Sequence, residues 1–560
     1  MVGRPPDRRP YPLAFVNGGL NLRAGQVALE RNQTKQAKNI SLLLEGGFTK
    51  TPGFTEIADL QTPIKGMHFY EGDNNEAELI AYHTPYISRV DTKRGISSFI
   101  DNSATGKPYI IENDGSPQFE KEVYKTGTTK TNRMHIVDGA NANSYFTGDQ
   151  ITAVSWPPSY SATNATQLAS VYATGTNYTA KGFPYDVCFY QNRMFFITKE
   201  DIGIIFFSKA GNGVDLNDNA GAPVPRDIAG YLNCPASTPF TAIESTPNGI
   251  MVYELNGTSR IVGINVPISG LSDQFEYQKM NSTIGALSPN LAVKLTDNEH
   301  LVLHTTGLYN IKLSQNFSEV KPGEVSYYIQ PAFDGLGRKQ LQKGKMLVAP
   351  HIGACLLTLP RKSTHLWNDK LYKYFYGVGS NSKPKTIPWM IDEFFGGAPT
   401  RFDAIALNPK TNEIYFAVYN KIYKWDGPSF LPDNNGAVTP IQSEYEFPPL
   451  DFDLNGIDKY ISAYYINYKS STGGIFYLDH AWDNGDDGRT RIDFTASDST
   501  NFPITFGSST WSSRSSFEDV GIRVPVSGGQ IGKQLVVTFL HNSSTEDITI
   551  YDIGVEYEIL

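Results

Sequence analysis

Few side chains in this sequence have the types and spacing that catalysis or metal binding requires. Of the nine histidines, only His300 and His304 lie close together, and on a strand they would share one face. No Asp, Glu or Cys stands beside them as a third ligand, so we interpret both as ordinary strand residues. The run 483–488, DNGDDG, lacks the alternating ligands and closing Glu of a calcium loop and is typical of a hairpin turn. The sequence therefore predicts no metal site.

Motifs of nucleotide binding and hydrolysis are missing as well. The sequence has no phosphate-binding Gly loop with its Lys and Ser/Thr, no G-x-S-x-G, no H-E-x-x-H and no repeated Asp-box turn. Asp451 and Asp453 could pair as acid and base, but an acidic surface on the last domain accounts for them. We therefore predict that the protein is not an enzyme, has no catalytic residue and needs no cofactor.

The composition favours short strands joined by turns. Among 560 residues, 12% are aromatic and only 19% are charged, and there are 50 glycines and 34 prolines. No run of 18 apolar residues occurs, and the start MVGRPPDRRPYP lacks the apolar stretch of a signal peptide, so we expect neither a membrane segment nor a cleavable leader. Cys188, Cys234 and Cys355 are odd in number and far apart, which predicts buried thiols. The predicted class is mainly β.

A repeated strand pattern organises the chain. Residues 185–213 hold three short apolar strands, at 187–190, 194–198 and 203–208, separated by polar turns. Similar units follow one another at intervals of 55 and 50 residues, and further units fit around 133–154 and 346–375. The clearest units start at Gly66, Val187, Ala242, Ala292 and Ala404.

Spacing of roughly 40 to 50 residues between four-stranded units is typical of a β-propeller, because each blade buries its faces against its neighbours. We therefore predict six or seven blades over residues 63–430. A set of β-sandwiches is the alternative, but the units lack the long connections that a Greek key needs. The predicted fold is a six- or seven-bladed β-propeller with a C-terminal antiparallel β-sandwich.

The segments on either side of the propeller differ from it. Residues 1–62 should form an N-terminal arm and a short α/β segment, with a helix around 27–29 and 33–38 and a strand over 39–44. A loop rich in Pro, Asn and Gly at 428–440 marks a domain boundary. Beyond it, residues 440–560 alternate apolar and polar residues in successive strands, which predicts the sandwich domain.

One stretch resembles a known family. Residues 189–196, FYQNRMFF, followed by 207–212, FSKAGN, are similar to the blade pattern "fyq-x-R-l-x-f … f-S-k-x-G" of tail nozzle proteins from short-tailed bacteriophages. These are the tail tubular protein B and packaged-DNA stabilisation families.

Two other regions resemble the same family. Residues 36–54 are similar to its opening pattern, with Thr51 in the place of an Arg before Pro-Gly, and residues 284–309 are similar to one of its blades. The resemblance thus spans about residues 20 to 315. The structural positions that it marks are Arg193, Ser208, Gly211, Pro52, Gly53, Gly285 and Gly307.

The resemblance implies a structural virion protein: the nozzle or tail-tube ring of a bacteriophage tail. Such a ring is made in the host cytoplasm, retains the packaged genome and conducts double-stranded DNA during ejection. The resemblance also implies a homo-oligomer, a hexamer, with a head-to-tail adaptor above it and a needle, plug or fibres below.

Charge is compatible with this role. Residues 440–560 hold 18 acidic and 7 basic residues, a local charge of −11 within a net charge of −9. Each phosphate that a protein neutralises adds affinity for DNA, so an acidic wall lowers friction, and we expect part of this charge to face the channel. Contact with DNA would be transient and not sequence-specific, because the sequence has no basic stripe or reading helix. The sequence does not assign the channel-lining residues.

The alternative function is a propeller that binds or degrades host-surface glycans as a tail-associated protein. Trp482 and Trp511 would then be exposed and stack on sugars.

Overall fold

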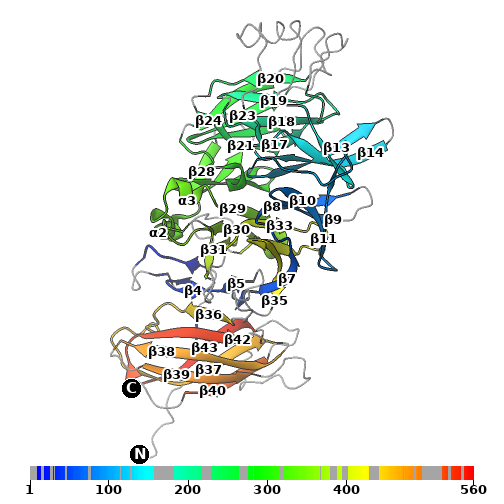
Figure 1. The fold of residues 1–560 in the computed structure, drawn as a ribbon. Helices are drawn as coiled ribbons and strands as arrows, with labels where there is room; N and C mark the ends of the chain where they lie inside the picture. Colours follow the sequence, from blue (N-terminus) through cyan, green and yellow to red (C-terminus); the bar gives the residue numbers. More distant parts are fainter. Residues whose placement is uncertain are drawn as a thin grey trace, which may run out of the picture.

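Apolar strands joined by tight polar turns form a row of antiparallel sheets (Figure 1). The structure is a computed structural model, and it describes the chain except residues 1–8, 14–17, 25–28, 31, 44–46, 73–76, 114, 127–128, 157–181, 201, 217–228, 237, 264–274, 282, 314–319, 366, 379–387, 394–400, 428–439, 471, 484–486, 495–519, 527–530, 544–545 and 547.

Seven sets of four strands form the blades of a propeller. The first three blades are β8 (Ile64–Glu71), β9 (Ala77–His83), β10 (Tyr86–Asp91) and β11 (Ile96–Phe99); β13 (Gln118–Thr126), β14 (Thr129–Val137), β15 (Ser144–Phe146) and β16 (Gln150–Ala153), with β12 (Asp101–Asn102) beside β16; and β17 (Pro184–Tyr190), β18 (Arg193–Thr198), β19 (Ile204–Phe207) and β20 (Gly230–Asn233).

Blades 4 to 7 complete the set. They are β21 (Phe240–Thr246), β22 (Gly249–Glu254), β23 (Gly257–Gly263) and β24 (Phe275–Asn281); β25 (Ala292–Thr296), β26 (Glu299–His304), β27 (Gly307–Leu313) and β28 (Val320–Glu324); β29 (Lys345–Ala349), β30 (Ala354–Leu359), β31 (Lys370–Tyr374) and β32 (Trp389–Glu393); and β33 (Ala404–Leu407), β34 (Ile414–Val418), β35 (Lys421–Gly427) and β7 (Gly53–Asp59).

The blades close into a ring. The inner strands pack side by side in the order β8, β13, β17, β21, β25, β29 and β33, and β33 packs against β8 again. The last blade combines strands from both ends of the propeller sequence. Its fourth strand, β7, comes from the N-terminal part of the chain and pairs with β35. The predicted propeller is therefore confirmed, with seven blades.

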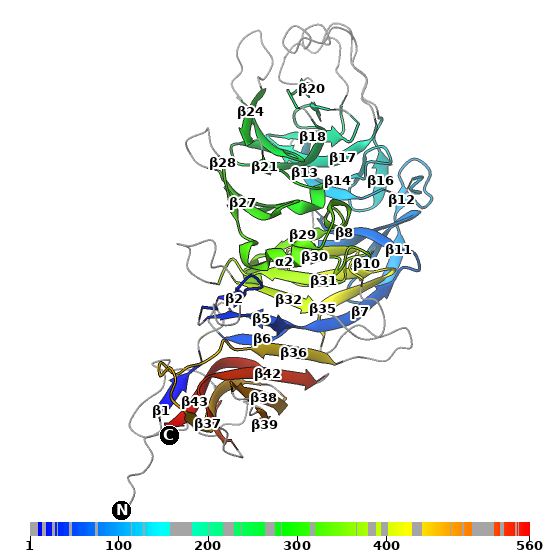
Figure 2. The same cartoon turned by 90° about the vertical axis from the view of Figure 1, so that its left-hand side faces the viewer.

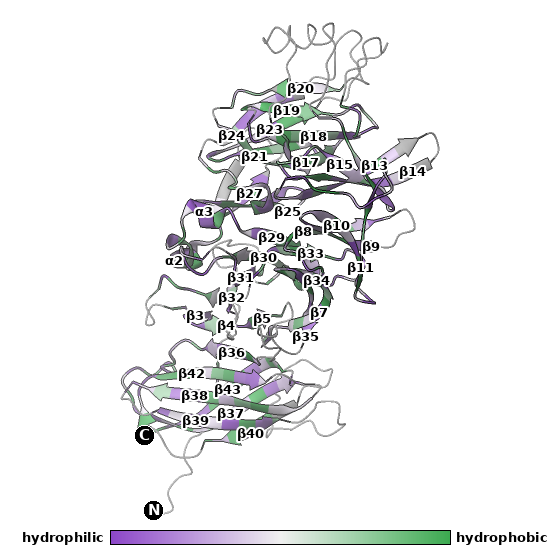
Figure 3. Ribbon diagram, viewed as in Figure 1, coloured by the Kyte–Doolittle hydropathy of each residue, from purple (hydrophilic) through white to green (hydrophobic). Residues whose placement is uncertain are grey.

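The apolar middle strands explain why these sheets stack. All six residues of β18, of β22 and of β30 are buried, since a strand inside a blade is covered on both faces. Apolar residues dominate β18 and β19 in Figure 3. Neighbouring blades share an apolar cluster, such as the one that joins Phe195 of blade 3 to Ile250 of blade 4. Burial of these side chains is the main force that holds the ring together.

The predicted C-terminal sandwich is also present. One sheet contains β36 (Ile441–Glu446), β42 (Leu535–Ser543), β38 (Gly474–Trp482) and β39 (Asp487–Phe494). The other contains β40 (Val520–Pro525), β37 (Lys459–Lys469), β43 (Thr549–Ile559), β6 (Phe48–Lys50) and β5 (Ile40–Leu42), with β1 (Arg9–Pro12) on β43 and β41 (Ile531–Gly532) on β37. Residues of β42 alternate between buried and partly exposed along most of the strand, which is the pattern of a half-buried strand.

A short strand joins the two domains. β4 (Ala37–Lys38) pairs with β32 of blade 6 on one side and with β36 of the sandwich on the other. Blade 6 therefore continues into the sandwich as one sheet of nine strands. Figure 2 shows β5, β6 and β36 between the blades and the rest of the sandwich.

The helix predicted over residues 33–38 is wrong, because these residues form β3 (Gln33–Thr34) and β4. The edges of β32 and β36 supply backbone partners for β4, and this tertiary pairing overrides local helix preference. Of the predicted helix at 27–29, residues 27 and 28 lie outside the described residues. The strand predicted over 39–44 is present as β5. Residues 9–59 thus add strands to blade 7, to the nine-stranded sheet and to the second sandwich sheet.

The α-helices of the described residues are short and lie between blades 5 and 6. They are α2 (Gln330–Asp334) and α3 (Arg338–Leu341), and the 3-10 turns are η3 (Pro289–Leu291), η4 (Tyr327–Ile329) and η5 (Pro350–Ile352). β2 (Gly19–Leu20) pairs with β3. Within the described part of the chain, no helix has the length and apolar character to cross a membrane.

Asn39 ties the domain junction together. Its Nδ2 donates to Gln442 O at 2.7 Å and to Glu393 O at 3.3 Å, and its Oδ1 accepts from Glu393 N at 3.1 Å. Its carbonyl accepts from Ser443 Oγ at 3.0 Å, and its φ is +54°. Asn is among the few residues that adopt a left-handed backbone and bond locally at little cost. One buried side chain therefore bridges blade 6 and the sandwich.

A buried ion pair reinforces the junction. Lys373 Nζ of β31 lies 2.8 Å from Asp392 Oδ1 of β32, and both side chains are fully buried. The N-terminal segment completes the set: Lys373 Nζ donates to Thr51 Oγ1 at 2.6 Å and to Ser41 Oγ at 3.0 Å. Buried charges stay in place only when they are paired and hydrogen-bonded, so these hydroxyls fasten the N-terminal segment to blade 6.

We predict that Asn39→Gly lowers the free energy of unfolding by about 1–3 kcal/mol, because the positive φ is kept while the side-chain hydrogen bonds are lost. Asn39→Ala should cost about 1 kcal/mol more, since it also strains the backbone. Urea denaturation measures both. The control is Asn412→Gly: Asn412 has φ +60° but is exposed, so this change should be nearly neutral. Equal effects at both positions would contradict the bridging role.

Candidate functional site

Arg193 and Ser208 hold one hairpin of blade 3 together. Arg193 Nη1 donates to Ser208 O at 2.7 Å, and the guanidinium lies 5.5 Å from the centre of the Phe207 ring. Ser208 Oγ accepts from Met194 N at 2.9 Å and donates to Lys209 O at 3.1 Å. Both residues are buried, so their side chains fix β18 against β19.

Three of the marked glycines stand where a side chain would not fit or would be strained. Gly211 has φ +74° and donates its N–H to Asn192 O at 2.6 Å, next to the Arg193 hairpin. A Cβ on Gly285 would lie 1.9 Å from Glu254 O. Gly307 has φ +140°. Glycine at these positions is a requirement of the backbone.

Pro52 and Gly53 mark the point where the chain leaves the sandwich and enters the propeller. β6 ends at Lys50 in the second sandwich sheet, and β7 begins at Gly53 in blade 7, opposite Gly427. The structure brings Arg193, Ser208 and Gly211 together but leaves the other marked positions apart. None of the seven lines the cavity described below.

The histidines considered as ligands have ordinary partners. His300 Nδ1 lies 2.6 Å from Tyr253 OH, and His304 Nδ1 lies 2.8 Å from Thr306 Oγ1. Burial lowers the pKa of His300 to about 4, which keeps the ring neutral. Among the described residues, no three side chains of His, Cys, Asp or Glu gather as metal ligands. All three cysteines are buried and free, as predicted.

The tryptophan proposed for glycan stacking does not present a surface. Trp482 is 4% exposed and packs in the core of the sandwich, so the expectation that it is accessible is wrong. Its position at the end of β38 turns its ring toward the opposite sheet. Trp511 lies outside the described residues. Asp451 Oδ1 accepts from Asp453 N at 3.0 Å, a local turn contact.

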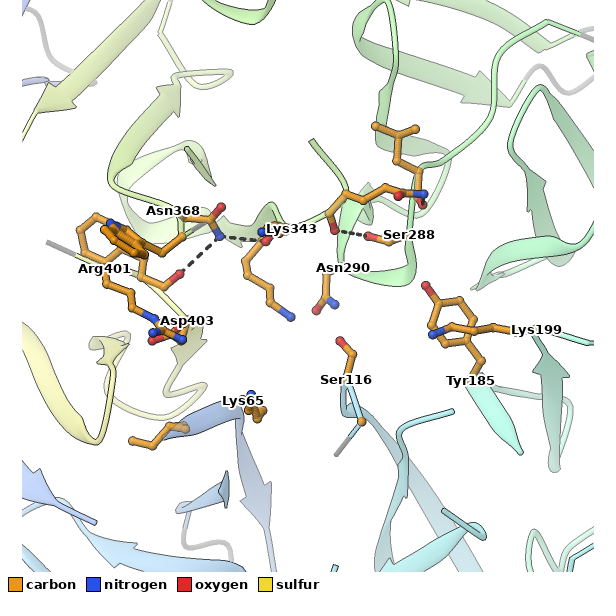
Figure 4. A pocket seen from close by; sticks show the side chains of 17 residues that line it. Lys65, Ser116, Tyr185, Lys199, Ser288, Asn290, Lys343, Asn368, Arg401 and Asp403 are labelled. Atoms are coloured by element: carbon orange, nitrogen blue, oxygen red, sulfur yellow. Dashed lines mark hydrogen bonds and ion pairs between the residues drawn. The ribbon is translucent and has the colours of Figure 1, made fainter. Parts of the chain in front are cut away.

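A cavity of about 450 Å³ opens where the inner strands of the propeller begin (Figure 4). Its walls come from the start of β8, β17 and β29, from the segments before β13, β25, β29 and β33, and from two loops. We call it the propeller mouth. It is lined by Ile64, Lys65, Gly115, Ser116, Tyr185, Lys199, Leu287, Ser288, Asn290, Gln342, Lys343, Lys345, Trp367, Asn368, Arg401, Phe402 and Asp403.

Positive charge dominates the mouth, whose lining holds four lysines and one arginine against one carboxylate. The carboxylate is Asp403, and its Oδ1 accepts from Arg401 Nε at 2.5 Å. Lys199 Nζ lies 4.2 Å from the centre of the Tyr185 ring. Burial lowers the pKa of Lys345 to about 8, although the Asp403 carboxylate opposes this shift.

Carboxyl groups line the inner strands further along. Asp186 Oδ2 of β17 accepts from Ile243 N of β21 at 2.8 Å, and Glu120 Oε1 of β13 accepts from Phe189 N of β17 at 3.0 Å. Burial raises the pKa of Asp186 to about 8 and that of Glu120 to about 7. Each carboxyl group thus bridges two adjacent blades, and its raised pKa favours the protonated, neutral form near pH 7.

Sequence reasoning missed the mouth because its residues are scattered over more than 300 positions. One signal was present: Lys65, Lys345 and Arg401 stand within three residues before the repeat units that start at 66, 346 and 404. Residues in that position of each unit converge only once the ring is closed.

The sheet topology defines the class of protein as a seven-bladed β-propeller with a C-terminal β-sandwich. No protein-family model matches the chain, and no curated protein is similar to it in sequence. Similar solved structures include the extracellular domain of the one-component system BT4673 from B. thetaiotaomicron, with 10% identity, a TM-score of 0.41, and coverage of 83% of this chain and 63% of that one.

Two further solved structures are similar to the chain. The C-terminal WD40 domain of Sif2 has 9% identity, a TM-score of 0.34, and coverage of 67% of this chain and 99% of that one. A humanized mutant of Polycomb Repressive Complex 2 from Chaetomium thermophilum, bound to the inhibitor GSK126, has 9% identity, a TM-score of 0.40, and coverage of 67% and 97%. The chain spans 63% of the length of the BT4673 domain.

We predict that Gly285→Ala destabilises the fold by about 2–4 kcal/mol, since its Cβ would overlap the Glu254 carbonyl that approaches from blade 4. Thermal unfolding by circular dichroism measures the effect. Gly335→Ala is the matched control, because a Cβ there meets nothing within 4 Å and the φ is −81°. A Gly285→Ala protein as stable as the Gly335→Ala protein would refute the close approach.

We predict that Lys345 makes stability rise between pH 8 and pH 10.5. Its pKa is lower in the folded chain than in the unfolded chain, so the unfolded chain binds more protons in this window. Lys345→Met should remove this rise and stabilise the protein at pH 7 by roughly 1–2 kcal/mol, allowing for the partial exposure of the side chain. Urea titrations of both proteins at pH 7 and pH 10 provide the comparison. An unchanged difference between the two pH values would argue against a desolvated ammonium.

Proposed function

We propose that the chain is a structural subunit of a bacteriophage tail, the nozzle or tail-tube ring that retains the packaged genome and conducts double-stranded DNA during ejection. The observation that carries this proposal is the nine-stranded sheet that runs from blade 6 into the sandwich. A tube wall that holds DNA under pressure needs subunits whose domains keep a fixed angle. Backbone hydrogen bonds across a shared sheet supply that stiffness, whereas a flexible linker would not.

The positions of the family-like residues support the same proposal. Asn39, Gly285 and the Arg193–Ser208 pair all act on the architecture: they bridge domains, allow blades to approach and pin a hairpin. Proteins that share an architecture are expected to resemble one another at such positions. We therefore assign the chain a structural role with no catalytic residue.

Charge on the sandwich fits a DNA conduit. Asp453, Asp458, Asp483, Asp487 and Asp493 are all exposed in the described part of this domain. Carboxylates repel the phosphate backbone, so DNA moves along a wall that carries them without binding to it. In the proposed assembly a homo-hexamer stands below a head-to-tail adaptor and above a needle, plug or fibres, and part of this acidic surface faces the axial channel.

The proposal predicts that the protein is found in mature phage particles at the distal tail. Immunogold microscopy with antibodies against the sandwich should label that end. Negative-stain images of the purified chain, alone and mixed with the adaptor, should show rings with an axial hole, and light scattering should give a mass of about six times 62.0 kDa.

Absence of the protein from purified particles would overturn the proposal. Cleavage of host-surface polysaccharide by a monomer would favour the glycan-degrading alternative.

A further inference from the structure

The propeller mouth has features that a structural wall does not require. Its charge is carried by Lys65, Lys199, Lys343, Lys345 and Arg401, which come from four different blades or the segments that lead into them. Bringing like charges together costs free energy unless a counter-charge is nearby. Asp403 is the one carboxylate in this lining and acts on Arg401, Lys65 and Lys345, so the lining residues together carry a net charge of about +4.

The form of these cations indicates which anion suits them. The Arg401 guanidinium already donates to Asp403 Oδ1, and it lies 5.5 Å from the centre of the Tyr419 ring. Arg401 Nε is therefore already engaged, and the other four cations of the mouth are lysines. Ammonium groups are point charges with three rotatable donors, and they suit phosphoryl oxygens, which spread charge over a tetrahedron.

Neutral donors complete the mouth. Ser116 Oγ and the Asn290 side chain make no hydrogen bond to the described residues, and both point toward the centre of the cavity in Figure 4. The Trp367 indole lines the same cavity, and its buried Nε1 has no acceptor among the described residues. A buried donor without an acceptor costs free energy that a bound oxygen would recover.

We propose that the propeller mouth is a binding site for a compact ligand with two or more phosphoryl groups, held by Lys65, Lys343 and Lys345, with Ser116 and Asn290 as neutral donors. A volume of about 450 Å³ accommodates a triphosphate or a nucleotide and falls in the range of small-molecule sites. Free polyphosphates and nucleotides are one source of this chemistry, and the phosphorylated end of a nucleic acid is the other. This site is independent of the proposed role in a tail.

Isothermal titration of the full-length protein at about 0.15 M salt tests the proposal. The probes are tripolyphosphate, a nucleoside triphosphate, a 5′-phosphorylated oligonucleotide with its unphosphorylated counterpart, and citrate. We expect saturable binding of at least one phosphate ligand and weaker binding of citrate. Tightest binding of tripolyphosphate or the nucleotide identifies a small-molecule site, and tightest binding of the oligonucleotide that depends on its 5′ phosphate identifies a nucleic-acid end.

Variants of the lysines locate the binding. Lys65→Gln and Lys345→Gln should each weaken the phosphate ligand about tenfold, because each removes one charge-assisted contact. Lys421→Gln is the matched control, since this lysine lies on β35 beside Glu56, outside the mouth. The proposal is overturned by lack of binding of every phosphate probe at millimolar concentration, by citrate binding as tightly, or by equal losses in all three variants.

Discussion

The structure depends on the pairing of two residues, Ala37 and Lys38, with two sheet edges at once. A sheet edge presents unpaired N–H and C=O groups, and these must find partners when they are buried. Blade 6 and the sandwich each have such an edge, and β4 fills both. The side chain of Asn39 and the Lys373–Asp392 pair then reinforce this junction between the domains with buried polar contacts. The orientation of one domain relative to the other is thereby fixed by backbone hydrogen bonds.

Around the propeller ring, too, a few polar contacts supplement a larger set of other contacts between neighbouring elements. Apolar clusters supply most of the stability between blades, and a few carboxyl groups, such as those of Asp186 and Glu120, fix the spacing by binding N–H groups of the next inner strand. Lys65, Lys345 and Arg401 of the mouth stand at the start of an inner strand or just before it. The proposed recognition therefore uses other positions of each blade than the carboxyl groups that join the blades.

Much of the fold could be predicted from the sequence. Alternation and turn residues predicted the propeller, the number of its blades to within one, and the sandwich, because these signals are local. The N-terminal segment was misjudged at residues 33–38: Ala37–Lys38 form a strand because they pair with edges more than 350 residues away, and Gln33–Thr34 pair with β2. The mouth was missed for a similar reason: Lys65, Lys345 and Arg401 share a position in the repeat but have no spacing that marks them as neighbours. Burial of Trp482 follows the alternation of its strand, because it shares one face of β38 with Phe476 and Leu478.

The early strands have a consequence for the order of events during synthesis. β7 finds its partner in residues 421–427, and β5 and β6 complete a sheet with residues 549–559. Strands β5, β6 and β7 must therefore wait for these later segments to be translated before they are fully paired. Long-range pairing of this kind slows folding. It also makes the sheets depend on distant parts of the chain: removal of residues 549–559 would leave the edges of β6 and β37 that they cover without partners.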